Sequence, residues 1–100
     1  MSREALGKVE RIAKVLKDIG KPVLIEGHTD NVISKGKLSN WEISVFRATY
    51  LLKHITKNLS FPGHLISASG YGDSKPVNEN KTAKDRMMNR RVEIKVKYVD

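Results

Sequence analysis

The chain has 100 residues, which is enough for one hydrophobic core and too few for two independent ones. It carries 19 Lys and Arg against 11 Asp and Glu, a formal net charge of +8, and its apolar content of 39% is too high for a disordered polycation. No apolar run approaches the length of a transmembrane helix, and the first residues do not resemble a secretion signal. Because the chain has no cysteine, a disulfide framework, a thiolate metal site and a cysteine nucleophile are excluded.

The N-terminal segment predicts an amphipathic helix over residues 3–19, beginning near Ser2 or Arg3. Apolar residues recur along it at three- and four-residue intervals, with charged residues between them. Gly20 suits the left-handed position that follows a helix, and Pro22 cannot continue one, so the helix is expected to end there.

A short apolar run follows this helix. Val23-Leu24-Ile25 lies between a proline and Gly27, a pattern typical of a central strand that is buried on both faces. Gly27-His28-Thr29-Asp30 comes directly after the run, and residues 31–38 are polar or turn-forming. We therefore expect residues 27–30 at the C-terminal end of a strand, followed by a surface loop over 31–38.

Ser39 and Glu42 fit a capping box, which predicts a second helix beginning at residue 40 and running to about Asn58. At 100° per residue its apolar residues fall on one core-facing side, and Pro62-Gly63 then breaks the chain. The members of this core-facing stripe are Ala48, Leu51, Leu52, Ile55 and Leu59.

The C-terminal third predicts a strand over 65–69, a loop through Pro76, a short helix from a Thr82 cap to Met88, and a strand over 92–98 that alternates apolar and charged residues. The resulting order is α-β-α-β-α-β. This order predicts an α/β (α+β) sandwich in which helices pack on one side of a small mixed sheet. We expect one domain over residues 1–100, with the lead helix in 1–20 and the remaining elements in 22–99.

Three features of these elements together suit a zwitterionic ligand. Asp30 follows the end of a buried strand, where open α/β sheets present ligand-binding groups, although an isolated aspartate there more often starts a turn. Arg47 lies on the same face of the second helix as Asn40, and the start of that helix offers unpaired amides to an anion. Asp30 would hold an ammonium group, and Arg47 would grip a carboxylate with two parallel hydrogen bonds.

Four motifs occur in the following order: Gly27-His28-Thr29-Asp30, Ile43-Ser44-x-x-Arg47-Ala48, Gly70-x-Gly72-x-x-x-Pro76 and Asn89-Arg90-Arg91-Val92-Glu93-Ile94. Together they resemble the OmpA-like peptidoglycan-binding domain over about residues 25–94. Ser39-Asn40-Trp41-Glu42 and the longer loop after Asp30 are more similar to the flagellar stator branch of the MotB type than to the outer-membrane branch.

This resemblance implies that Asp30 and Arg47 bind the diaminopimelate end of the peptidoglycan stem peptide, with supporting places for Thr29, Asn40 and Arg91. It implies a non-enzymatic anchor without a cofactor or metal, located in the periplasm. It also implies a homodimer and a parent protein held in the inner membrane beside a channel-forming partner subunit. A cell-wall anchor of an outer-membrane protein or lipoprotein is the alternative within the family.

The sequence departs from the family in one respect, because no strand precedes the first helix. Two explanations stay open: the parent chain continues upstream, or the sheet is one strand short.

We interpret Arg90 as a solvated arginine at the entry of the last strand. Phe46 and Tyr50 lie opposite the core-facing stripe, and either the third helix or loop 31–38 covers them or they form a subunit contact.

Other chemistries find less support in the residues. His28-x-Asp30 could begin a metal site or an acid–base pair, but His54 and His64 lack a metal-like spacing to it and no third orienting group can be named. A nucleic-acid-binding module is the alternative from another class, since the chain is basic. Such modules place aromatic residues on an open sheet face, whereas here three lie on a helix and Tyr98 alone ends a strand.

Overall fold

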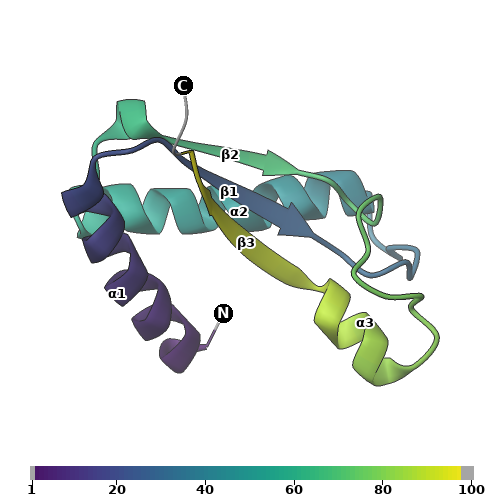
Figure 1. Cartoon of the computed structure of the whole chain (residues 1–100). Coiled ribbons are helices and arrows are strands. Elements are labelled where there is room, and N and C mark those ends of the chain that lie inside the picture. The colour runs from purple at the N-terminus through teal and green to yellow at the C-terminus, as the bar shows by residue number, and fades with distance from the viewer. Residues whose placement is uncertain (1, 98–100) are drawn as a thin grey trace.

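The computed structural model of the chain describes residues 2–97. Its elements are α1 (Arg3–Ile19), β1 (Val23–His28), α2 (Asn40–Asn58), the 3-10 helix η1 (Gly63–Leu65), β2 (Ile66–Gly70), α3 (Ala83–Asn89) and β3 (Arg91–Val96) (Figure 1). The predicted order of helices and strands is confirmed, with η1 as an addition. The predicted end of the last strand at Tyr98 lies outside the described residues. None of the helices within residues 2–97 combines the length and apolar character needed to cross a bilayer.

Local sequence signals set the ends of the helices. The hydroxyl of Ser2 accepts a hydrogen bond from the Ala5 amide at 3.1 Å, and Gly20 ends α1 in the left-handed conformation with φ of 71°. Ser39 and Glu42 form both halves of the predicted capping box of α2. These ends agree with the sequence expectations to within a residue.

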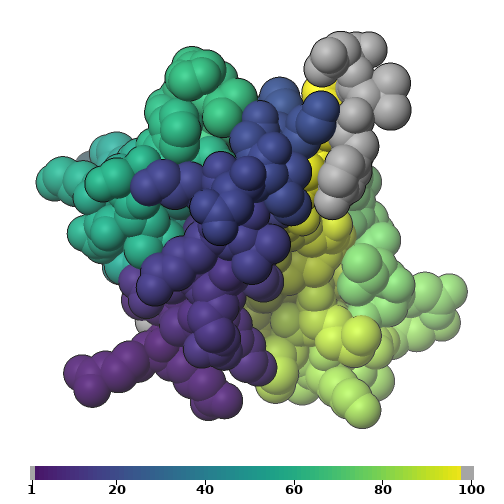
Figure 2. All heavy atoms as spheres, turned by 60° about the vertical axis from the view of Figure 1, so that its left-hand side comes forward, coloured from purple at the N-terminus to yellow at the C-terminus, as the bar shows by residue number. Residues whose placement is uncertain are grey.

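The three strands form a mixed sheet in the order β2-β1-β3. β1 runs parallel to β2 and antiparallel to β3, so that Ile25 lies between Ala68 and Ile94. α1 and α2 contribute to one apolar core on the same face of this sheet, and Figure 2 shows α1 in front, with α2 on one side and β3 on the other. The buried apolar residues of that core are Ala13, Leu16, Val23, Ile25, Ala48, Leu51, Ile55 and Phe61. The expected sandwich is confirmed.

Of the two glycines expected to end strands, Gly27 lies inside β1 and Gly70 is the last residue of β2. A Cβ atom on Gly27 would lie 2.0 Å from the backbone oxygen of Ser44, and one on Gly70 would lie 2.5 Å from the amide nitrogen of Val45. β1 therefore continues through Gly27 to His28, because the glycine lets the backbone of α2 approach the sheet. This close contact holds the first turns of α2 against the C-terminal ends of β1 and β2.

Candidate functional site

Backbone contacts fix the segment that follows β1. The Thr29 amide donates to the Gly72 carbonyl at 2.8 Å, and the Tyr71 amide donates to the Gly27 carbonyl at 3.0 Å. The Gly72 amide donates in turn to the hydroxyl of Ser44 on α2 at 2.9 Å. The loops after β1 and β2 are therefore tied to each other and to α2.

Asp30 lies in this fixed segment, and its residue is only 6% exposed. Its Oδ1 atom accepts a hydrogen bond from the Val32 amide at 3.0 Å, which is the turn-starting contact weighed from the sequence. Its Oδ2 atom lies 2.6 Å from Nη1 of Arg90, in an ion pair between residues 60 positions apart. Asp30 therefore has a local role in the loop and a long-range partner.

Thr29 and Asn40 brace the backbone around Asp30. The Thr29 hydroxyl donates to the Asp30 carbonyl at 2.9 Å. Asn40, the first residue of α2, donates from Nδ2 to the Val32 carbonyl at 3.0 Å and more weakly to the Asp30 carbonyl at 3.4 Å. Thr29 and Asn40, for which the resemblance implied supporting roles, thus lie beside Asp30, and their hydrogen bonds fix the backbone of the loop after β1.

Arg47 lines a groove of about 790 Å³ between the start of α1, α2 and the start of β3. The lining includes Ile43, Phe46, Arg47, Tyr50, Arg90 and Arg91. Arg47 is exposed, and the ion pairs within residues 2–97 leave it without a carboxylate partner. Arg47 and Arg90 line the same groove, and Arg90 also pairs with Asp30. Arg90 therefore lies between Asp30 and Arg47, the two ligand-binding residues predicted from the sequence.

The interpretation of Arg90 as a solvated arginine is incomplete, because Arg90 is exposed as expected but is also the ion-pair partner of Asp30. Asn89 explains its position. The Asn89 residue is fully buried at the end of α3, where its side chain accepts from the Val77 amide at 2.7 Å and donates to Asn78 and Asn80 at 2.7 and 2.8 Å. The Asn-Arg-Arg motif could have directed attention to Arg90 and Arg91. No spacing rule, however, indicates which of the two arginines reaches a loop 60 residues away.

Arg91, chosen for support, points to other partners. Its Nε atom donates to the Glu93 carboxylate, and its guanidinium also reaches the carbonyls of Asn89 and Lys75 at 3.3 and 3.0 Å. Arg91 therefore ties the start of β3 to the loop after β2 while lining the groove beside Arg90.

The expectation that α3 or loop 31–38 covers the second apolar side of α2 is wrong. Phe46 is 56% exposed and Tyr50 is 59% exposed, and both line the groove beside Arg47. The groove thus has an apolar wall on α2 and a cationic rim of arginines.

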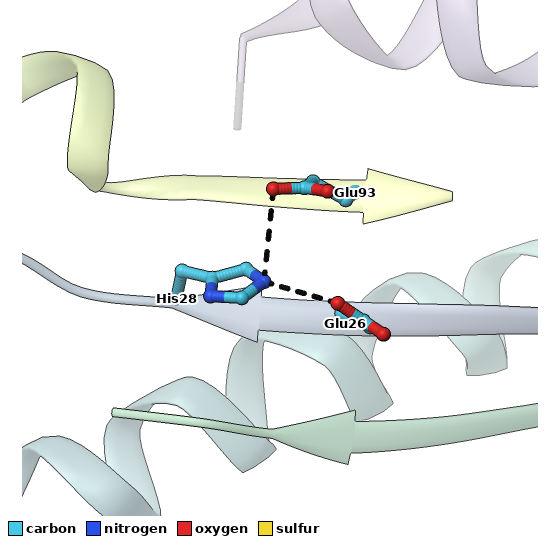
Figure 3. Close-up of side chains that lie close together, drawn as sticks. All are labelled: Glu26, His28 and Glu93. Carbon is cyan, nitrogen blue, oxygen red and sulfur yellow. Dashed lines mark hydrogen bonds and ion pairs between the residues drawn. The ribbon is translucent and has the colours of Figure 1, made fainter. Parts of the chain in front are cut away.

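The face of the sheet opposite α2 carries a polar cluster (Figure 3). Glu26 pairs directly across the sheet with Glu93, and Nε2 of His28 lies 3.3 Å from Glu26 and 3.9 Å from Glu93. Burial, and secondarily the positive charge of Arg91, lowers the pKa of His28 below its usual value. The hydrogen bond from Arg91 lowers the pKa of Glu93. A neutral imidazole thus lies between two carboxylates.

This cluster has the donor atoms of a metal site but already contains its counterions. Lys95 Nζ lies 3.2 Å from Glu26, and Arg91 binds Glu93, so the charges of the carboxylates are balanced while His28 is neutral. A divalent cation would have to displace both side chains. His28 also belongs to this cluster while Asp30 pairs with Arg90, so the structure does not join His28 and Asp30 in one acid–base or metal site.

The comparison with known proteins agrees with this architecture. Residues 2–90 match the model of the OmpA family. The chain belongs to the OmpA family. The resemblance drawn from the four motifs is therefore confirmed, and the groove and the Asp30–Arg90 pair are features of an OmpA family domain.

Individual relatives of this OmpA family domain extend the comparison. Motility protein B of Bacillus subtilis (strain 168) is 45% identical over 74 residues, which cover 72% of the chain and 28% of that protein. The C-terminal domain of Helicobacter pylori MotB superimposes with a TM-score of 0.86 at 29% identity, covering 100% of the chain and 78% of that structure. The cell wall anchor of the T6SS from Pseudomonas aeruginosa superimposes with a TM-score of 0.80 at 33% identity, covering 94% of the chain and 66% of that structure.

Proposed function

We propose that this domain binds peptidoglycan non-covalently and anchors its parent protein to the bacterial cell wall. The observation that carries the proposal is the groove that joins Arg47 to Arg90 and, through Arg90, to the carboxylate of Asp30. Arginines beside an apolar wall, with the Asp30 carboxylate paired to one of them, suit the diaminopimelate end of a stem peptide, which carries an ammonium and a carboxylate on one carbon. Family membership and the likeness to a cell wall anchor support the same ligand.

In this proposal Asp30 receives the ammonium group and Arg47 the carboxylate. Thr29 and Asn40 hold the Asp30 loop in place, and Arg91 supports the groove where β3 begins. The role is binding without catalysis, because each proposed contact is a hydrogen bond or an ion pair to an unreacted ligand.

The expected affinity of one site is low. A charged hydrogen bond contributes about 1.5 to 3 kcal/mol, so two give roughly 3 to 6 kcal/mol, and millimolar binding requires about 4 kcal/mol. Repetition of identical stem peptides, together with dimerisation of the domain, would raise the effective concentration and make attachment useful. The net charge of +8 also attracts the domain to a carboxylate-rich polymer.

We further propose that the parent is a flagellar motor stator subunit of the MotB type, with this domain in the periplasm as part of a homodimer. The parent would then lie in the inner membrane beside a channel-forming subunit. The identity to Motility protein B supports this assignment, and an outer-membrane protein or lipoprotein is the alternative parent. Loss of swimming, with normal assembly of flagella, after deletion of the parent gene would support the stator assignment, whereas unchanged swimming would contradict it.

Sedimentation with purified sacculi tests the binding proposal. We predict that Arg47→Ala and Asp30→Asn each reduce co-sedimentation at least about tenfold, since each removes one charge contact. Arg47 is exposed, so Arg47→Ala should keep its melting temperature. Asp30→Asn retains an oxygen for the Val32 amide but loses the ion pair with Arg90, so its sedimentation is measured well below its own melting temperature. Arg11→Ala on α1 is the control for the loss of one positive charge in Arg47→Ala.

Two outcomes would contradict the proposal. If both variants co-sediment with sacculi as the wild type does, Arg47 and Asp30 do not bind peptidoglycan. If the wild type binds single-stranded RNA but not sacculi, the nucleic-acid alternative replaces peptidoglycan. The sheet does not favour RNA, because the face opposite α2 carries the carboxylates of Glu26 and Glu93, which repel phosphate groups.

A further inference from the structure

Both carboxylate oxygens of Asp30 have partners in the structure. Oδ1 accepts from the Val32 amide, and Oδ2 accepts from Arg90 at 2.6 Å. The Asp30 side chain is 9% exposed, so its carboxylate has little contact with water and depends on these donors for compensation. An incoming ammonium group therefore meets an oxygen that is already neutralised.

Arg90 differs from Asp30 in its freedom to move. Its backbone is fixed by the buried Asn89 before it and by β3 after it, but its side chain is 44% exposed and lines the groove. A guanidinium with this exposure can leave Asp30 without unfolding its surroundings. Once released, it faces the same groove as Arg47.

The charge balance decides which ligands can cause this release. A simple amine that replaces Arg90 on Asp30 gains one ion pair and breaks another, so the exchange yields little net free energy. A ligand with an adjacent carboxylate offers Arg90 a new partner within the groove, alongside Arg47. Exchange is then favourable because every charge keeps a counterion.

We propose that Arg90 is a specificity-determining residue, an internal competitor for Asp30 that restricts binding to ligands carrying both an ammonium and a carboxylate. This inference rests on the proposed function, since it concerns the same groove. It assigns to the pair a second role besides fixing the loop: the pair rejects plain amines and side chains of lysine type. Amidation of the ligand carboxylate should weaken binding for the same reason.

A matched pair of ligands tests the inference. Diaminopimelate and 1,5-diaminopentane share the same spacing of two amines, and the second lacks both carboxylates. Chemical-shift titration of the full chain by NMR measures both affinities in the millimolar range. For the wild type we expect diaminopimelate to bind at least about tenfold more tightly than the diamine.

Arg90→Ala should reverse part of this preference. Without its competitor, Asp30 should bind the diamine more tightly, and the ratio of the two affinities should fall at least about tenfold. Arg47→Ala should lower the affinity for diaminopimelate, because the ligand carboxylate loses a partner. The affinity for the diamine should stay low, because Arg90 is still paired with Asp30. Arg11→Ala is the control for net charge and should match the wild type.

A readout in the wild type does not depend on how the variants fold. The side-chain Nε–Hε signal of Arg90 should shift on addition of diaminopimelate and remain in place with the diamine. If Arg90→Ala leaves the affinity ratio unchanged, or if both ligands shift the Arg90 signal equally, the inference is overturned while the proposed function stands. If the wild type binds neither diaminopimelate nor sacculi, the proposed function fails and this inference fails with it.

Discussion

Gly27 and Gly70 allow the backbone of α2 to contact the sheet. A side chain at either position would overlap backbone atoms of Ser44 or Val45, which cannot move without shifting the whole helix. The same contact places the start of α2 beside the Asp30 loop. At the scale of single residues, the site therefore depends on the absence of a side chain as much as on charged groups.

We predict that Gly27→Ala destabilises the fold by about 3 kcal/mol, at the upper end of the usual cost of overpacking, because the added Cβ would lie 2.0 Å from a backbone oxygen. Urea unfolding of the two proteins measures the difference. Gly63→Ala is the matched control, since its Cβ would meet nothing within 4 Å, and it should change the free energy of unfolding by less than about 1 kcal/mol. Equal stabilities of the two variants would rule out the close approach.

The sequence indicated which residues belong to the site, but it did not indicate which residue pairs with Asp30. Asp30, Asn40 and Arg47 could be selected because each follows a recognisable strand end or helix start. The pairing of Asp30 with Arg90 could not, since it depends on how the turn after α3 aims a side chain toward a loop 60 residues away. Ion pairs at this sequence distance follow from tertiary packing and leave no local pattern.

At the scale of elements, helix ends and both ends of β2 were predictable to within a residue, whereas the C-terminal end of β1 was not. Caps act through contacts among neighbouring residues, so Ser39 and Glu42 reveal the start of α2 directly. Strand ends depend on pairing with other strands, and β1 extends to His28 because Arg91 of β3 pairs with it. The glycine in between was therefore misinterpreted as a terminator.

The cap of α2 supports both the helix and the site. Ser39→Ala should cost about 1 kcal/mol of stability, because the Glu42 amide loses its acceptor. Thermal and urea unfolding measure this loss, and Ser39→Asn, a good cap without a change of charge, should restore most of it. A loss of equal size in the alanine and asparagine variants would show that capping is not the role of Ser39.

Over the whole molecule, the two faces of the sheet differ in the kind of interaction that stabilises them. The helix-covered face holds the apolar core, and the other face holds the alternating charges of β3, as the alternation predicted. Glu26 and Glu93 lie directly opposite each other, an arrangement that is unfavourable unless cations compensate it. Lys95 and Arg91 provide this compensation, so the open face is held together by charges that respond to pH.

We predict that the domain loses stability on acidification in two steps. Burial keeps the pKa of His28 below its usual value of about 6.5, so the unfolded chain takes up a proton first as the pH falls, and protonation favours unfolding. The lowered pKa of Glu93 stabilises the fold above about pH 4.5, the usual value, and this contribution is lost as the pH falls through the lowered pKa. The melting temperature should therefore begin to drop as the pH falls through about 6.5, the usual pKa of histidine, and drop again below about 4.5.

His28→Gln should remove the first drop and Glu93→Gln should reduce the second, while the exposed His64→Gln should follow the wild-type curve. Melting temperatures measured across the pH range test both steps. Titration of the His28 ring protons in the wild type gives a direct reading that does not require the variant to fold. A His28 midpoint at or above about 6.5 would contradict the first step, because the buried imidazole would then take up its proton as readily as the unfolded chain does.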